Sequence, residues 1–175
     1  NKDYMKHNMT FIGRKICFIG AHPDDIELGC GALIAHISGK SEIFCITLSD
    51  NQKNPLLKNL LAEHQRSMSI LGVQPENNIV SKFETRRFSQ HRQEILEYLI
   101  DFNHKHHPEI VFVHSKSDNH QDHGIVTNEA FRAFRGCTLL GFEIIRSSSG
   151  FTPSFLVEVD EADVKKKIDA LSQYK

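Results

Sequence analysis

The sequence predicts an α/β fold, a Rossmann-like three-layer sandwich with a mostly parallel sheet and helices on both faces. Short continuous apolar runs, of which 15–20 and 109–114 are the clearest, are typical of strands buried on both faces. These runs alternate with longer segments of helical periodicity, and this alternation favours parallel strands joined by helices. The 175 residues, 39% of them hydrophobic and 25% charged, have the size and mixture of one domain, which we place at 1–175.

The first half of the chain contains two buried strands and two helices. The strand at 15–20 follows a polar segment and leads to a helix at 29–39, whose small and apolar residues suit close packing on a sheet. A second continuous apolar run predicts a strand at 43–48. After a polar loop, the leucines of 55–71 recur at helical spacing, and the glycine directly after them marks the end of this helix.

The second half of the chain continues the alternation. A weaker strand is predicted at 79–83, and a long helix at 90–107 is stopped by Pro108. The apolar run at 109–114 is a buried strand with a polar end. The remaining expected elements are a helix at 124–134, strands at 139–145 and 154–159, and a helix at 161–174 with Asp160 as its N-cap.

Charge and composition exclude several classes of protein. A formal net charge of -1 provides no basic excess, so nucleic acid is not an expected partner. No apolar run approaches membrane-spanning length and the polar N-terminal segment has no secretory signal, so we expect a cytoplasmic protein without stable membrane insertion. The four cysteines stand singly, which predicts reduced thiols rather than disulfides or a zinc knuckle.

A dense cluster of polar side chains follows the first strand. His22, Asp24 and Asp25 stand within four positions at the point where this strand ends. An imidazole and two carboxylates are costly to bury together, and a bound divalent metal would compensate them. A loop with a turn-forming Pro23 and a helix-capping aspartate is the alternative interpretation of this stretch.

A second cluster of the same kind, His120, Asp122 and His123, follows the strand at 109–114. Because the carboxyl ends of parallel strands meet at one edge of a sheet, we expect the two clusters to face one crevice. A catalytic zinc takes three protein ligands from His and Asp or Glu and keeps one position open. The residues alone do not decide which members of each cluster bind the metal, and they leave the role of His114 open.

The two clusters resemble the motifs of the zinc-dependent N-deacetylases of the PIG-L (LmbE-like) family. The first motif, Ala21-His22-Pro23-Asp24-Asp25 followed by Glu27-Leu28-Gly29-Cys30-Gly31, is an intact match. In the second, His120-Gln121-Asp122-His123, glutamine replaces the usual proline, which changes the stiffness of the backbone and keeps every candidate ligand. The resemblance runs from the first strand nearly to the last residue. Members commonly continue beyond the point where this chain stops, so a missing C-terminal segment stays open.

The resemblance implies a division of roles among these residues. The implied ligands of one zinc ion, with Fe²⁺ as an alternative metal, are His22, Asp25 and His123. Asp24 would be the base that deprotonates the attacking water, and His120 would stabilise the oxyanion or protonate the leaving amine. Asp122 would orient or tune His120, although residues at i and i+2 do not face each other on a regular helix.

The implied reaction removes an N-acetyl group from an amino sugar, which is a GlcNAc-type glycoside, glycolipid or nucleotide sugar, and releases acetate and a free amine. The expected partner is this small molecule, and the oligomeric state, a homo-oligomer included, is left open.

The segment 85–88 also resembles part of a branch of the family. Its Arg86 and Arg87, together with Arg92, offer forked donors for a phosphate or sugar hydroxyls, although a solvated helix start explains them equally well. Asp118 stands where some relatives have a tyrosine, so a tyrosyl oxyanion donor is not expected.

Three other kinds of protein share single features with this chain. The Gly-x-Gly at 29–31 is a partial dinucleotide-binding motif, but Ile34 takes the place of its last glycine. His22, Asp24 and His123 fit the two-His, one-carboxylate triad of a non-haem iron oxygenase, although such triads usually lie on all-β folds. A metal-binding domain without catalysis is the remaining alternative.

Overall fold

The computed structural model describes residues 10–51 and 54–175, so the polar N-terminal segment and two residues of the polar loop after the second strand lie outside the described residues. Within these ranges, five strands form one sheet in the order β3-β2-β1-β4-β5, and every neighbouring pair is parallel. The strands are β1 (Lys15–Gly20), β2 (Glu42–Thr47), β3 (Asn78–Val80), β4 (Ile110–His114) and β5 (Thr138–Phe142). The strand order switches between β1 and β4, which is where doubly wound sheets open a crevice at their carboxyl ends.

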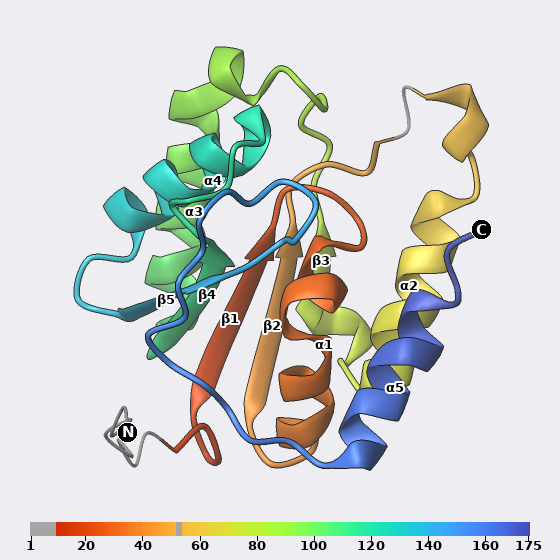
Figure 1. Ribbon diagram of the computed structural model, residues 1–175. Helices are drawn as coiled ribbons and strands as arrows, with labels where there is room; N and C mark the ends of the chain where they lie inside the picture. The colour runs from red at the N-terminus through yellow and green to blue at the C-terminus, as the bar shows by residue number, and fades with distance from the viewer. Residues whose placement is uncertain (1–9, 52–53) are drawn as a thin grey trace.

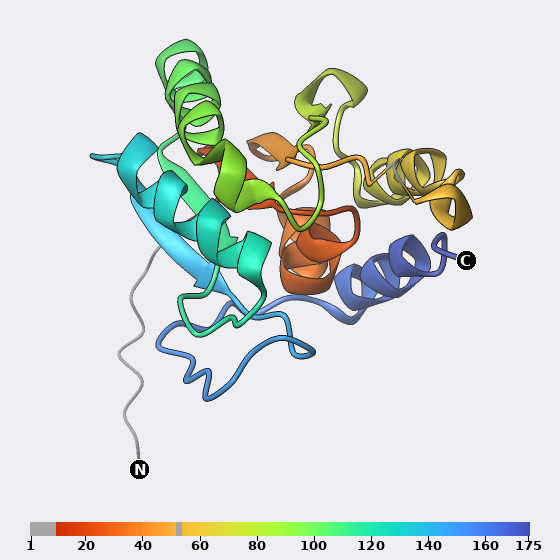
Figure 2. The ribbon, with the colours of Figure 1, turned by 90° about the horizontal axis from the view of Figure 1, so that it is seen from above.

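Helices cover both faces of the sheet, which confirms the predicted three-layer sandwich (Figure 1). They are α1 (Asp25–Ile37), α2 (Leu60–Leu71), α3 (Arg92–His106), α4 (Gln121–Ala133) and α5 (Glu161–Leu171), with short 3₁₀ turns at Pro55–Leu57, Pro75–Asn77 and Phe88–His91. Helices α1, α2 and α5 pack together on one face and α3 and α4 on the other, and Figure 2 shows α1 and α5 side by side. In the described part of the chain, none of these helices is long and apolar enough to cross a bilayer.

Each face of the sheet buries its own apolar cluster, because successive strand residues point to opposite sides. On the α1 side, Phe18 of β1 stacks on Phe112 of β4 with their ring centroids 4.9 Å apart. On the α3 side, Cys17 and Ile19 of β1 belong to the same buried cluster as Leu99 of α3. Burial on both faces explains why continuous apolar runs were the correct signal for these strands.

Two helices begin earlier than predicted. Helix α1 begins at Asp25 rather than at 29, and α4 begins at Gln121 rather than at 124. The first turn of α4 has no apolar side chain, and in the first turn of α1 the acidic Asp25 and Glu27 alternate with Ile26 and Leu28, so neither turn shows the apolar periodicity that predicts a helix. The clusters of the two loops therefore reach into the first turns of the helices.

The predicted strand at 154–159 is wrong. This segment pairs with no strand in the described residues, and it packs Phe155 and Val157 onto the α1-side cluster from an irregular loop. Alternating apolar side chains alone do not make a strand, because a strand also needs a neighbour for its backbone hydrogen bonds. Strand β3 is shorter than predicted, and β5 ends three residues earlier.

Gly29 of α1 lies against the side chain of Phe142 of β5. A Cβ atom on Gly29 would overlap the ring of Phe142. We therefore expect Gly29→Ala to destabilise the fold by about 1–3 kcal/mol, despite the better helix propensity of alanine. Urea unfolding measures this change.

The matched control is Gly124→Ala on α4, where an added Cβ meets no atom within 4 Å. This control should be neutral or stabilising by up to about 1 kcal/mol. Equal stabilities of the two variants would contradict the close packing of α1 on β5.

Candidate active site

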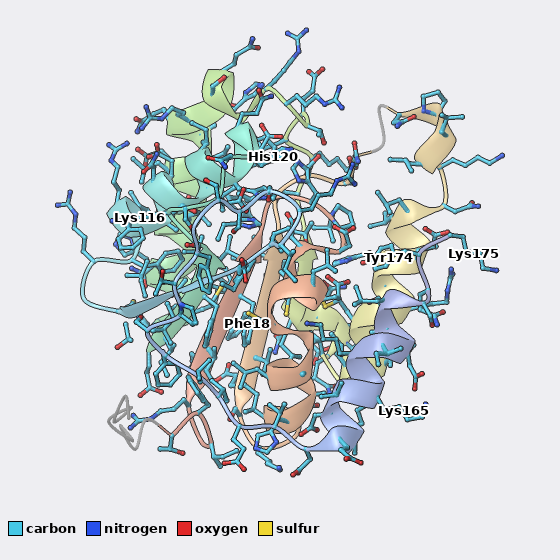
Figure 3. All side chains as sticks on the ribbon, in the orientation of Figure 1. Phe18, Lys116, His120, Lys165, Tyr174 and Lys175 are labelled. Carbon is cyan, nitrogen blue, oxygen red and sulfur yellow. The ribbon has the colours of Figure 1, made fainter. Side chains whose placement is uncertain are left out.

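The two polar loops meet at the carboxyl ends of β1 and β4, as the parallel sheet predicts. The first loop leaves β1 and enters α1, and the second leaves β4 and enters α4. The ring centroids of His22 and His120 lie 5.0 Å apart, and those of His120 and His123 lie 4.3 Å apart. Figure 3 labels His120 near the carboxyl ends of the strands. The structure thus joins the two clusters into one group of side chains.

One carboxylate oxygen, Oδ2 of the buried Asp25, lies at the centre of this group. It accepts hydrogen bonds from the backbone N–H groups of Ala21 at 3.0 Å and His22 at 2.8 Å. Three imidazole nitrogens lie 3.4–3.5 Å from it, namely Nδ1 of His22, Nε2 of His114 and Nε2 of His123. Burial raises the pKa of Asp25, but His114 and the other two imidazoles hold it well below its ordinary value. The carboxylate is therefore ionised and surrounded by further metal-ligand atoms.

Two overlapping sets of side chains in the described residues bring possible ligand atoms within 4.8 Å of one another at this place. One set contains Asp25, His114 and His123, and the other contains His22, His120 and His123. The predicted ligands His22, Asp25 and His123 are divided between the two sets, which share His123. His114, whose role the sequence left open, joins them. A buried carboxylate with several imidazoles is a donor set that fits zinc.

Asp118 holds His123 from the side opposite Asp25. Nδ1 of His123 lies 2.8 Å from Oδ2 of Asp118, and this oxygen also accepts from the hydroxyl of Ser147 at 2.9 Å. Burial raises the pKa of Asp118, but its hydrogen bonds to His123 and to the backbone of His120 lower it overall. A proton kept on Nδ1 leaves Nε2 of His123 free to bind a metal. In the sequence, Asp118 was noted only as a carboxylate shortly before the second motif, at a position where some relatives have a tyrosine, and neither feature predicts its contact with His123.

Replacing Asp118 with alanine should weaken zinc affinity by about 10–100-fold, because such outer carboxylates fix the orientation of the ligand imidazole. Competition with a chelator measures this affinity. Ser147→Ala removes only one hydrogen-bond partner of Asp118 and should cost less than about tenfold. Wild-type affinity in Asp118→Ala would show that Asp118 does not orient the ligand.

Asp122 connects the second cluster to the first and to Arg86. Its Oδ2 lies 3.0 Å from Nε2 of His22 and accepts the backbone N–H of Arg86 at 2.6 Å. The contact with His120 runs through the backbone instead, where the N–H of Asp122 donates to Nδ1 of His120 at 3.2 Å. Burial lowers the pKa of His22, but Asp122 and Asp25 raise it overall to about 9. The carboxylate of Asp122 therefore contacts His22, and Asp122 contacts His120, the partner that the family resemblance suggested, only through the backbone.

Arg86 is tied to the site through its backbone. It has a left-handed backbone with φ of 68°, and its carbonyl accepts from the side chain of Gln121 at 2.9 Å. Its side chain is exposed beside the site. Arg87 pairs with Glu84 at 3.2 Å, and the guanidinium of Arg92 is held by the buried Glu129 at 2.6 Å. Of the arginines considered from the sequence, Arg86 is thus the best placed to meet a substrate.

Asp24 occupies the turn between β1 and α1 with φ of 88°, a left-handed conformation that is uncommon for residues other than glycine. Its half-buried carboxylate does not cap the helix. Burial raises the pKa of Asp24 to about 7, and the negative charges of Asp25 and Glu27 add to the increase. Burial and the neighbouring imidazoles lower the pKa of His120, which favours its neutral form. The cluster thus contains a carboxylate able to take up a proton and a neutral imidazole.

Comparison with known proteins shows the family to which this chain belongs. Residues 17–134, which span β1 to α4 and both polar loops, match the family described as PIG-L, GlcNAc-PI de-N-acetylase. The chain belongs to the PIG-L family. The uncharacterized deacetylase YaiS of Escherichia coli (strain K12) is 31% identical to this PIG-L protein over 169 residues, which cover 91% of this chain and 90% of YaiS.

Solved structures share the fold of this PIG-L domain at low sequence identity. N,N'-diacetylchitobiose deacetylase of Pyrococcus horikoshii has a TM-score of 0.71 and 16% identity, covering 93% of this chain and 71% of that one. GalB, a 4-carboxy-2-hydroxymuconate hydratase of Pseudomonas putida KT2440, has a TM-score of 0.72 and 18% identity, covering 91% and 78%. Because a hydratase shares the fold, the fold alone does not assign the reaction. The PIG-L family and YaiS support a deacetylase.

A large cavity lies beside the cluster around Asp25, on the α1 side of the sheet. Its volume is about 1130 Å³, and residues of α1, β5 and the irregular segment before α5 line it. Most of its lining is apolar, with Leu33, Phe142 and Phe155 as examples. Of the side chains around Asp25, His114 forms part of the cavity wall, whereas Asp24, His120 and His123 do not line it.

Proposed function

We propose that this protein is a zinc-dependent N-deacetylase that removes the N-acetyl group from an amino sugar of the GlcNAc type, present in a glycoside, glycolipid or nucleotide sugar. The observation that carries the proposal is the buried carboxylate of Asp25 among three imidazole nitrogens, with Asp24 directly before it. The description of the family and the name of the P. horikoshii relative both refer to N-acetylated sugars, which supports this substrate class. The products would be acetate and a free amine.

The proposed zinc ligands are His22, Asp25 and His123, as the family resemblance implies. When bound, zinc would polarise the amide carbonyl and lower the pKa of water. Asp24 takes the proton from the attacking water, a role that suits a carboxylate whose pKa is raised. His120 donates a hydrogen bond to the carbonyl oxygen as negative charge develops there. As the C–N bond breaks, the nitrogen receives a proton, either the one that Asp24 took from water or one from His120, which Asp24 then replaces.

We propose that the rest of the substrate lies beside the metal cluster. Arg86 and Arg87 are exposed and would contact a phosphate or sugar hydroxyls. The cavity beside His114 has room for an aglycone. We also place the enzyme in the cytoplasm, which the buried free thiols of Cys17 and Cys45 support.

A non-haem iron oxygenase is less well supported. Its triad would need Asp24 as a ligand together with His22 and His123. In the part of the chain that the structure describes, Asp24 belongs to none of the sets of close ligand atoms. The parallel sheet with helices on both faces also differs from the all-β folds on which such triads usually lie. These two observations favour the hydrolase.

The test is acetate release by the zinc-loaded protein from a panel of acetylated sugars that comprises GlcNAc, diacetylchitobiose, a nucleotide-linked GlcNAc and a GlcNAc-inositol phospholipid. We expect acetate and an equal amount of free amine from at least one of them. A zinc-loaded protein that is inert on the whole panel would favour a metal-binding domain without catalysis. Oxygen consumption with Fe²⁺ would instead favour the oxygenase.

A further inference from the structure

A buried polar cluster outside the metal site joins α1, α2 and the end of the chain. It consists of Glu27 on α1, His64 on α2 and Tyr174 after α5, which Figure 3 labels beside α2. The side chains of Glu27 and His64 are fully buried. Nδ1 of His64 lies 3.2 Å from Oε1 of Glu27 and 3.0 Å from the hydroxyl of Tyr174. The same hydroxyl donates to Oε1 of Glu27, so the three groups contact one another.

This buried polar cluster is expected to reduce the stability of the fold compared with apolar packing between the same helices. Oε2 of Glu27 is buried and has no hydrogen-bond partner among the described residues, and an unpaired buried polar atom destabilises a fold. Apolar side chains often replace buried ionic groups without loss of stability, and the best-attested use of such groups is to fix one specific arrangement. The element that Glu27 fixes is the first turn of α1.

The first turn of α1 begins at Asp24, whose backbone is unfavourable for a residue with a Cβ atom. No hydrogen bond from the Asp24 side chain to the helix end offsets this strain. The carbonyl of Asp24 accepts from the N–H of Leu28 at 2.8 Å. Asp25 anchors the turn to the preceding loop through two backbone hydrogen bonds, and Glu27 anchors it to the cluster. Asp24 is thus held by contacts that its neighbours make.

We propose that Glu27, His64 and Tyr174 form a positioning network for Asp24. This inference rests on the proposed function, in which Asp24 is the base. Tyr174 and His64 hold Glu27, and Glu27 holds the first turn of α1 so that the carboxylate of Asp24 stays at the reacting atoms. Loss of the network lets the strained backbone of Asp24 relax, and a misplacement of about 1 Å at a reacting group is enough to cost up to about 100-fold in rate.

Tyr174→Phe tests this network, because it removes one hydroxyl and leaves the ring in place. We expect kcat to fall about tenfold, with KM within about twofold of wild type and zinc content unchanged. In an Asp24→Asn background, the same substitution should lower the residual rate no further, because its effect passes through Asp24. The matched control is Tyr98→Phe on α3, at the opposite face of the sheet, which should leave kcat and KM unchanged.

Amide hydrogen exchange gives a second readout that does not depend on activity. The N–H of Leu28 should exchange at least about tenfold faster in Tyr174→Phe than in the wild-type protein, and at the wild-type rate in Tyr98→Phe. Glu27→Gln keeps the volume of the side chain and removes its charge. It should show the same two effects, and it replaces Tyr174→Phe if that variant does not fold.

Wild-type kcat and wild-type exchange in both Tyr174→Phe and Glu27→Gln would overturn the inference. An equal fall of kcat in the Asp24→Asn background would also overturn it, because the network would then act independently of Asp24. An inactive wild-type protein would count against the proposed function instead. In that case the exchange rate of the Leu28 N–H in Tyr174→Phe still tests the network. Faster exchange than in the wild-type protein supports it, and unchanged exchange refutes it.

Discussion

Replacing Asp24 with asparagine is expected to reduce kcat for acetate release by about 10²–10⁴-fold, the usual contribution of a general base. Asparagine has nearly the same volume as aspartate and does not take up a proton at neutral pH. Zinc content should stay at the wild-type level, because in the described residues Asp24 is in none of the sets of close ligand atoms. Acetate release and metal analysis on the same sample measure both quantities.

The control for this substitution is Asp101→Asn, an exposed aspartate on α3, which should keep full activity. Full acetate release by Asp24→Asn with zinc bound would show that another residue is the base. Loss of zinc together with activity would indicate that Asp24 is a metal ligand. That result would favour the two-His, one-carboxylate triad of a non-haem iron oxygenase, which includes Asp24.

Replacing His123 with alanine is expected to abolish both zinc binding and acetate release. His123 belongs to both sets of close ligand atoms, with Nε2 3.4 Å from Asp25 and Nδ1 held by Asp118. A three-ligand zinc site that loses one imidazole keeps too few donors to hold the ion tightly. We expect at least about a 100-fold loss of zinc affinity, measured by chelator competition, and acetate release at the background rate.

Parallel variants identify the ligand set around His123. If His22, Asp25 and His123 are the ligands, His22→Ala should lose zinc as His123→Ala does, and His114→Ala should keep most of it. The opposite result would assign the metal to Asp25, His114 and His123. His104→Ala, an exposed histidine on α3, is the control and should bind zinc normally. Unchanged zinc affinity in His123→Ala would refute both assignments.

Much of the fold could be predicted from the sequence, because burial on both faces leaves a strong apolar signal. Strand β1 occupies the predicted 15–20, and Asp160 caps α5 in a capping box with Asp163. The apolar pattern predicted a strand at 154–159 that does not form, because burial of side chains does not by itself provide hydrogen-bond partners for the backbone. Phe155 and Val157 are packed as strand residues would be, yet their backbone has no strand to pair with in the described residues.

The position of the site was also predictable, because parallel strands bring the ends of β1 and β4 to one edge. The partners of each side chain were not. Asp122 contacts His22, which is 100 residues away in the chain. Asp118 contacts His123 across a turn whose conformation could not be predicted from the residue pattern. The contact of Glu27 with Tyr174 likewise depends on where α5 packs. Such pairings follow from three-dimensional packing rather than from spacing along the chain.

The most direct test of the proposed function is acetate release by one sample before metal removal, after it, and after zinc is restored. The wild-type protein should release acetate from its sugar substrate, lose this activity on treatment with a chelator, and regain it with one zinc ion per chain. The restored sample should produce free amine and acetate in equal amounts. Acetate release at the full rate by the metal-free protein would contradict the assignment of the Asp25 cluster as a catalytic zinc site.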